Sequence, residues 1–272
     1  KNNNVYLIYQ SGLCMNRVLV FLTLLILLCS FSGCTSSVEI DPTVENAIET
    51  GNFQNLDLSG LYLAETNFDR TNWSGANLQG ANLYNSDFIL ANLEYVDFRG
   101  ADLRETIFLA ANLDNSDLSN SRMFSANFHY AQLNFANLSF VSAFESDMSN
   151  TNLMNSDISN SDFTESDFSS TNLFSSIAKE TILTNVEMTK SNLSYVDFSY
   201  SDLSNSNLRN SYMAGTKLIG TNLSGTDLGL SDLQFADLTG AVFDGKTVWI
   251  GIQWYYTICP DGTNSGESRD CF

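Results

Sequence analysis

The chain has 272 residues, 43% of them hydrophobic and 16% charged, and a formal net charge of −19 at pH 7. The low share of charged residues, two prolines and 19 phenylalanines argue against an intrinsically disordered chain. The acidic balance disfavours nucleic acid as a partner, because phosphate repels a surface of the same sign.

The N-terminal segment has the pattern of an export signal. Met15 is followed by Arg17, an apolar run over 18–28 and small residues that end at Cys34. A basic start, a short apolar stretch and small residues before the break are typical of a secretory signal. We therefore expect a signal peptide at 15–33. Residues 1–14 carry no pattern, and we expect them to be a non-native upstream extension.

The end of this leader indicates how the chain is anchored. Ser32-Gly33-Cys34 resembles a bacterial lipobox, with Phe31 where that motif usually has Leu. The resemblance implies that Cys34 becomes the lipidated, palmitate-bearing first residue of a membrane-anchored lipoprotein. Cleavage by the ordinary signal peptidase and a plain membrane anchor are the alternatives. All three send the remaining chain out of the cytoplasm, so we expect it in the cell envelope.

Residues 34–52 are predicted to be a tether followed by an N-terminal cap. Asp41 suits a helix N-cap, Pro42 the first helical position and Gly51 the terminator. The apolar residues between them are Val44, Ala47 and Ile48. We expect this short helix to cover the apolar start of the region that follows.

Residues 53–245 repeat with a period of five. From Phe68 to Phe243, every fifth residue is large and apolar at 34 of 36 positions, and only Ala143 and Ala178 fall short. The residue two places earlier is always Ala, Ser, Thr or Val, and the residue between is Asn or Asp at 26 of 36 positions. Residues two apart on an extended chain point to the same side. The small and large residues therefore face inward together.

Neither long helices nor long strands suit this period. Five residues advance an α-helix by about 500°, which spreads the apolar positions around the whole cylinder. A period of five also alternates badly with the period of two in a strand. The pattern predicts a chain that bends after each short extended piece and stacks on itself as a solenoid.

Units such as Ala76-Asn77-Leu78-Gln79-Gly80 resemble the motif of the pentapeptide repeat family over about 190 residues. The resemblance implies an all-β fold, a right-handed quadrilateral parallel β-helix in which four pentapeptides make one coil. We expect about nine to ten coils. At about 4.8 Å per coil, they would make a rod roughly 45 Å long.

The pattern changes after Phe243, and we expect residues 246–272 to form an aromatic C-terminal cap with a disulfide loop. Cys14 and Cys29 leave with the leader and Cys34 carries lipid, so Cys259 and Cys271 remain as an even pair. In an exported protein such a pair favours a disulfide. A zinc site is the alternative, although no His is nearby.

The sequence predicts no catalytic, metal or cofactor site. His129 lies at an outward variable position, and no nucleophile is placed beside a base. Carboxylates are abundant, so a polysaccharide-acting enzyme of the envelope is a third reading. The acidic row Asp147, Asp167 and Glu187 is a tolerated repulsion or a weak cation site.

Stacking the sequence in blocks of twenty indicates how the faces differ. One face carries an uncharged ladder of amides, which are Asn72, Asn92, Asn112, Gln132, Asn152, Asn172 and Asn192. Outward aromatic residues form the candidate interaction surface, which consists of Phe124, Tyr130, Phe135, Phe140, Phe144, Tyr95 and Tyr195. The motif is weakest around Ala143 and over 177–186, where we expect bulges or loops.

The favoured function is a non-catalytic, membrane-anchored scaffold or protein-binding module of the bacterial cell envelope. Its partner would be a protein, with self-association as a homodimer as an alternative, and the lipid bilayer would hold the N-terminal anchor. The family resemblance suggests a second reading, a DNA mimic that binds the topoisomerase DNA gyrase. That reading requires a cytoplasmic protein, which the leader opposes.

Overall fold

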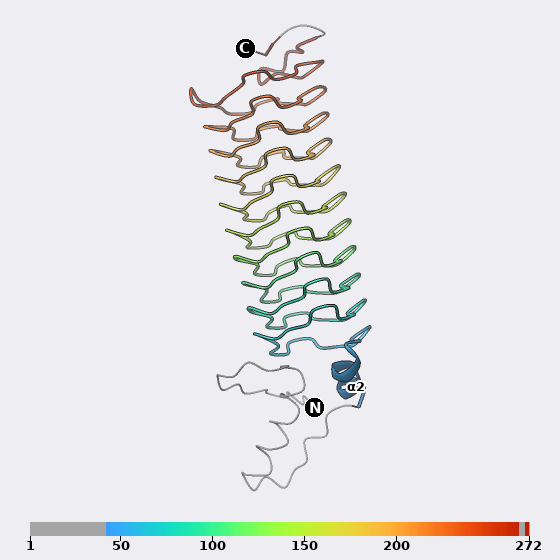
Figure 1. The fold of residues 1–272 in the computed structure, drawn as a ribbon. Coiled ribbons are helices and arrows are strands. Elements are labelled where there is room, and N and C mark those ends of the chain that lie inside the picture. Colours follow the sequence, from blue (N-terminus) through green and yellow to red (C-terminus); the bar gives the residue numbers. More distant parts are fainter. Residues whose placement is uncertain (1–41, 267–269, 272) are drawn as a thin grey trace.

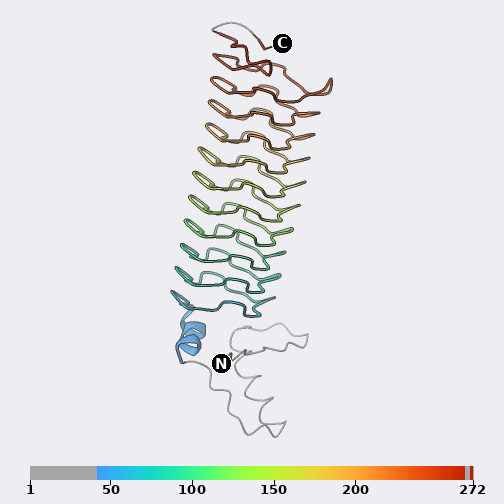
Figure 2. The same cartoon turned by 180° about the vertical axis from the view of Figure 1, so that it is seen from behind.

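The computed structural model describes residues 42–266 and 270–271 of the chain. They form a rod of stacked coils with helix α2, Pro42–Thr50, at one end and the C-terminal residues at the other (Figures 1 and 2). The predictions for the leader, for lipidation at Cys34 and for Asp41 as N-cap concern residues outside this described part.

Parallel backbone bridges join each coil to the next. Bridged residues are 20 apart, from Asn52 with Asn72 to Asn222 with Val242, so four pentapeptides make one coil. Each strand is a single bridged residue at the Asn/Asp position, and turns occupy the residues between. In a typical link the Leu78 N–H donates to the Asp97 carbonyl at 2.7 Å. The predicted β-helix is confirmed, while the count of coils stays a prediction.

The core is a line of side chains along the axis of the rod. The small and the large residue of one pentapeptide are both buried, as for Ala81 and Leu83, which are each 0% exposed. On one side of the axis Phe88, Phe108 and Phe128 stack, with centroid separations of 5.4 and 4.8 Å between neighbours. Offset stacks of this kind add to the energy of apolar burial.

The last residue of each pentapeptide has a left-handed backbone. Its φ is 52° at Asn85 and 64° at Tyr200, and the same sign recurs every five residues from Asn55 to Gly240. No Val, Ile or Thr occupies this position between those two residues. β-Branched side chains are strongly disfavoured at positive φ, which explains their absence.

We expect Asn155→Val to lower the free energy of unfolding by about 1–3 kcal/mol, because it places a β-branched residue at a φ of 56°. Asn155→Gly is the matched control and should change stability little, since glycine adopts this conformation freely. Urea titration followed by circular dichroism measures both. Equal stability of the two variants would contradict this explanation of the missing residues.

The expected bulges or loops around Ala143 and over 177–186 are not present, and that prediction is wrong. The 20-residue register continues through Ser142 to Asp162 and through Ile177 to Asp197. Ala143 and Ala178 are fully buried at their central positions. One coil later, the same position is occupied by Phe163 above Ala143 and by Phe198 above Ala178. We infer that the larger residue of the next coil fills the space that each alanine leaves.

Helix α2 packs against the first coil. It begins at Pro42, and Gly51 after it has a φ of 69°. Ala47 is buried in the core of the rod, and Val44 and Ile48 pack against that core. The helix therefore shields apolar side chains that no preceding coil covers.

The coil continues beyond residue 245, where the repeat is predicted to end. Asp227 pairs with Val248, Asp232 with Gln253 and Asp237 with Ile258, each 21 residues on. One extra residue between Val242 and Val248 shifts the phase, after which the coil resumes. The Asp244 carboxylate accepts the backbone N–H groups of Lys246 and Gly225, both at 2.9 Å, and so stabilises this longer turn.

A hairpin closes the C-terminal end. Trp249 and Trp254 pack against the core, and Cys259, 3% exposed, takes the next central position. The chain then folds back, and Thr263 accepts the Cys259 N–H at 2.7 Å, while Tyr256 donates to Gly266 at 2.9 Å. The predicted disulfide between Cys259 and Cys271 is present in the structure.

Candidate functional site

Most outward Asn and Asp side chains stabilise the turns of the coil. The side-chain oxygen accepts the backbone N–H two residues on, as in Asp117 with Ser119 and Asp202 with Ser204, both at 2.9 Å. This Asx turn holds the bend after each bridge. Both Asn and Asp have the side-chain oxygen that this turn needs, which explains why they interchange at this position. In these Asp residues, one carboxylate oxygen accepts a backbone N–H.

The predicted amide ladder forms along one face in two parts, which are separated at Asn112. The side-chain amide of Asn92 donates to Asn72 at 3.2 Å, and the same contact links Asn172 to Asn152 and Asn192 to Asn172, both at 3.1 Å. Asn152 also donates to Gln132 at 3.2 Å. The ladder begins one coil earlier than predicted, at Asn52, which accepts from Asn72 at 3.0 Å. It stabilises the stacking of coils without charge.

Asp102 is the most enclosed carboxylate of the described chain. Its side chain is 8% exposed and accepts from Arg104 Nε at 2.7 Å and from Arg122 at 2.9 Å. Partial burial acts to raise the pKa of Asp102, but the hydrogen bond from Arg104 and the charges of Arg122 and Arg104 outweigh it. The pKa of Asp102 therefore lies below its ordinary value of 3.8. We assign this cluster to the stability of the rod.

We expect Asp102→Asn to lower the free energy of unfolding by about 1–2 kcal/mol at pH 7, because two arginines lose a charged acceptor. The folded pKa is depressed, so the carboxylate stabilises the fold above pH 3.8 and this contribution is lost as the pH falls through the folded pKa. Thermal unfolding of both proteins at pH 7 and at about pH 2 should show the difference shrink. A difference that stays constant would contradict the assignment.

The predicted acidic row lies on a different face of the rod from the amide ladder. Asp147, Asp167 and Glu187 occupy consecutive coils and are bridged in register. Ser149 and Ser169 donate their backbone N–H groups to Asp147 and Asp167, at 2.9 and 2.8 Å. Within the described residues, no group of three or more His, Cys, Asp or Glu side chains is arranged to hold a metal ion.

His129 lies next to this row. Its ring Nδ1 is 2.7 Å from the Ser149 hydroxyl and 4.0 Å from an Asp147 oxygen. Its backbone N–H donates to Asn127 at 2.9 Å. The ring lies at an outward position, as predicted, and is partly exposed.

The candidate aromatic surface is distributed around the rod. Tyr130, Phe135 and Phe140 are 55–60% exposed. They end three successive pentapeptides, and each pentapeptide forms a different side of the coil, so the three rings lie at different corners. Tyr95, Phe135 and Tyr195 share one corner but are two and three coils apart in the register. The structure brings together only Phe124 and Phe144, whose rings stack at 4.2 Å. The predicted residues therefore do not form one continuous surface.

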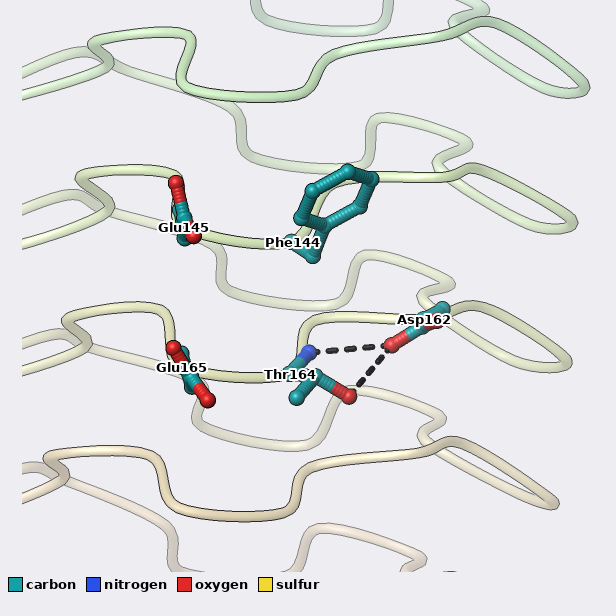
Figure 3. A pocket seen from close by; sticks show the side chains of 5 residues that line it. All are labelled: Phe144, Glu145, Asp162, Thr164 and Glu165. Carbon is teal, nitrogen blue, oxygen red and sulfur yellow. Dashed lines mark hydrogen bonds between the residues drawn. The ribbon is translucent and has the colours of Figure 1, made fainter.

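The Phe124–Phe144 pair borders a pocket that sequence reasoning missed. The pocket has a volume of about 270 Å³ and is lined by Phe144, Glu145, Asp162, Thr164 and Glu165. Figure 3 shows that Phe144 and Glu145 lie on one coil and the other three residues on the next. Asp162 accepts the backbone N–H of Thr164 at 3.0 Å and its hydroxyl at 2.6 Å. The pocket combines an aromatic ring with three carboxylates.

Sequence comparison assigns the fold to a known family. The family model for pentapeptide repeats matches residues 57–94, 74–108, 110–139, 136–173, 178–210 and 206–245, which together are more than half of the chain. The chain belongs to the pentapeptide repeat family. Its fold is accordingly a right-handed β-helix solenoid, and the predicted family is confirmed.

Solved structures of pentapeptide repeat proteins resemble the chain at low identity. HetL of the cyanobacterium Nostoc, involved in regulating heterocyst differentiation, is 21% identical, with 83% of this chain and 99% of HetL covered and a TM-score of 0.36. QnrB1, a plasmid-mediated fluoroquinolone resistance protein, is 20% identical, with 68% and 90% covered and a TM-score of 0.48. No curated protein matches the chain in sequence.

The described residues of this pentapeptide repeat protein contain one helix, α2. None of its described helices has the length and apolar character needed to cross a bilayer. The predicted anchor at Cys34 belongs to the segment outside the described residues.

Proposed function

We propose that this pentapeptide repeat protein is a non-catalytic rod that binds a protein partner in the bacterial cell envelope, where a lipid on Cys34 holds it. The non-catalytic part of the proposal is supported by the hydrogen bonds and ion pairs that the outward carboxylates form within the rod. Those at the Asn/Asp position accept backbone N–H groups in Asx turns, as Asp117 and Asp157 do, or pair with arginine and lysine, as Asp102 and Asp197 do. Members of the family are generally structural or binding proteins.

The binding role draws on the shape and the outward side chains of the rod. Side chains at one position of the coil recur at the same corner every 20 residues, so they form rows along the axis. Large aromatic rings in these rows remain exposed, including Tyr95 at 63% and Phe135 at 60%. Exposed aromatic residues on a stiff support are a common means of protein recognition. The net charge of −19 makes nucleic acid a poor partner.

Site-specific cross-linking in living cells tests the binding role. A photoreactive phenylalanine analogue at Tyr95, Tyr130, Phe135, Phe140 or Phe144 samples the corners and the pocket. We expect a discrete adduct with one envelope protein from at least one of these positions. The analogue at Glu49, an exposed residue of α2, is the control. Absence of any adduct would contradict the binding role.

Catalysis is tested separately with the purified protein. It is incubated with neutral and acidic glycans, and new reducing ends and unsaturated products are measured. We expect neither product above the level of a heat-denatured sample. Turnover that depends on the folded protein would contradict the non-catalytic part of the proposal.

A further inference from the structure

We propose that the pocket beside Phe144 binds an arginine side chain of the protein partner, an inference that rests on the proposed function. The pocket lies between two consecutive coils on one face of the rod (Figure 3). The inference depends on an exposed apolar ring pair, on the charge around it and on the size of the space.

The ring pair gives the pocket its apolar side. Phe124 and Phe144 occupy the same position of consecutive coils, and their rings are 4.2 Å apart at an angle of 27°. Phe144 is 37% exposed although it is a large apolar residue. The next residue in this row is Thr164, which is too short to continue the stack. The row of rings therefore ends at the pocket.

The charge around the ring pair is negative and has no ion-pair partner among the described residues. Glu145 and Glu165 follow in register on one corner, and Asp162 lies across the pocket from them (Figure 3). None of the three takes part in an ion pair of the described residues, and Arg99, Arg104, Arg122, Lys179, Arg209 and Lys217 form their ion pairs with other carboxylates. Asp147 and Asp167 add negative charge two residues further along the chain. Charge complementarity therefore calls for a cationic occupant.

The chemistry of the pocket favours arginine among the cations. A metal ion does not suit it, because the three carboxylates of the pocket, like the other His, Cys, Asp and Glu side chains of the described residues, are not arranged to hold one. A guanidinium group can stack its plane on a phenylalanine ring and donate forked hydrogen bonds to carboxylates. An ammonium group is a compact and strongly hydrated point charge that uses the ring less well. A volume of about 270 Å³ accommodates the planar head of arginine with part of its stem.

Peptide binding to the full chain tests the inference. The probes are three fluorescein-labelled peptides of alternating glycine with arginine, lysine or citrulline, and binding is followed by fluorescence anisotropy at moderate salt. Citrulline keeps the shape of arginine without its charge. We expect the arginine peptide to bind at least about threefold more tightly than the lysine peptide, and the citrulline peptide to bind least.

Two variants and two matched controls locate the binding site. We expect Phe144→Ala to weaken binding of the arginine peptide about fivefold or more. Glu145→Gln with Glu165→Gln should weaken it about tenfold. The controls are Phe135→Ala, an exposed ring at another corner, and Glu49→Gln with Glu180→Gln, which removes two exposed charges elsewhere. Each control should change binding less than about twofold, because surface charges act weakly beyond the Debye length. Circular dichroism verifies that all variants remain folded.

Equal losses in the variants and in their controls would overturn the site, because net charge alone would then explain binding. Equal affinity for arginine and lysine peptides would overturn the choice of arginine. The cross-linking test separates this inference from the proposed function. If the partner adduct persists undiminished in the Phe144→Ala and Glu145→Gln/Glu165→Gln proteins, the pocket inference fails and the binding role stands. If peptides bind as expected but no position gives an adduct, the binding role fails.

Discussion

Phe108→Ala is expected to lower the free energy of unfolding by about 3–5 kcal/mol. Phe108 is 0% exposed and stacks between Phe88 at 5.4 Å and Phe128 at 4.8 Å, with the edge of Phe98 at 6.0 Å. Removing the ring leaves a cavity between coils, and the bridged backbone on both sides prevents its collapse. Urea titration followed by circular dichroism measures the loss.

Phe108→Leu is the matched control, because leucine is the commonest residue at this position of the repeat. We expect it to cost clearly less than the alanine variant, since it refills most of the volume. In a solenoid each coil contacts only its neighbours, so the alanine variant should also unfold less cooperatively. Similar losses in both variants would contradict the role assigned to the aromatic stack.

Reduction of the disulfide between Cys259 and Cys271 is expected to destabilise the C-terminal hairpin by about 2–3 kcal/mol. The bond joins the last central position of the rod to the end of the hairpin, which supplies the acceptors for the Cys259 and Tyr256 N–H groups. The effect should stay local, because solenoid coils communicate through their neighbours. Hydrogen exchange with and without a reductant measures it.

The amides of Cys259 and Tyr256 should lose protection after reduction, while that of Leu153 in the middle of the rod should not. Cys259→Ala with Cys271→Ala gives the same comparison without a reductant. Uniform loss of protection along the chain would show that the bond stabilises the whole rod. Unchanged protection at the hairpin would show that backbone hydrogen bonds alone hold it.

The architecture of the core was predictable, because the period of five places one small and one large inward residue in each pentapeptide. Residues such as Leu83 and Phe108 are buried where the sequence places them. The left-handed residue of each pentapeptide was missed, although the absence of Val, Ile and Thr at that position was a visible signal. The single extra residue before Val248 was missed because one insertion ends a strict pattern while the fold accommodates it in a longer turn.

The candidate site was less predictable than the core. Phe124 and Phe144 belong to the predicted set of outward aromatics, and their spacing of 20 residues distinguishes them from Tyr130 and Phe140. Residues 20 apart stack, whereas residues 5 or 10 apart occupy different corners, so the spacing predicts this pair and not one continuous aromatic surface. The pocket itself depends on how the side chains of Glu145, Asp162 and Glu165 are oriented, which the repeat does not determine.

The central claim, an envelope rod held by lipid, is tested most directly by the N-terminus of the protein in bacteria. The measurement is mass spectrometry of the N-terminal peptide from fractionated cells, with and without globomycin, which blocks lipoprotein signal cleavage. We predict a diacylated or triacylated Cys34 in the membrane fraction and an uncleaved precursor under globomycin. Intact, unlipidated protein free in the cytoplasm would contradict the account.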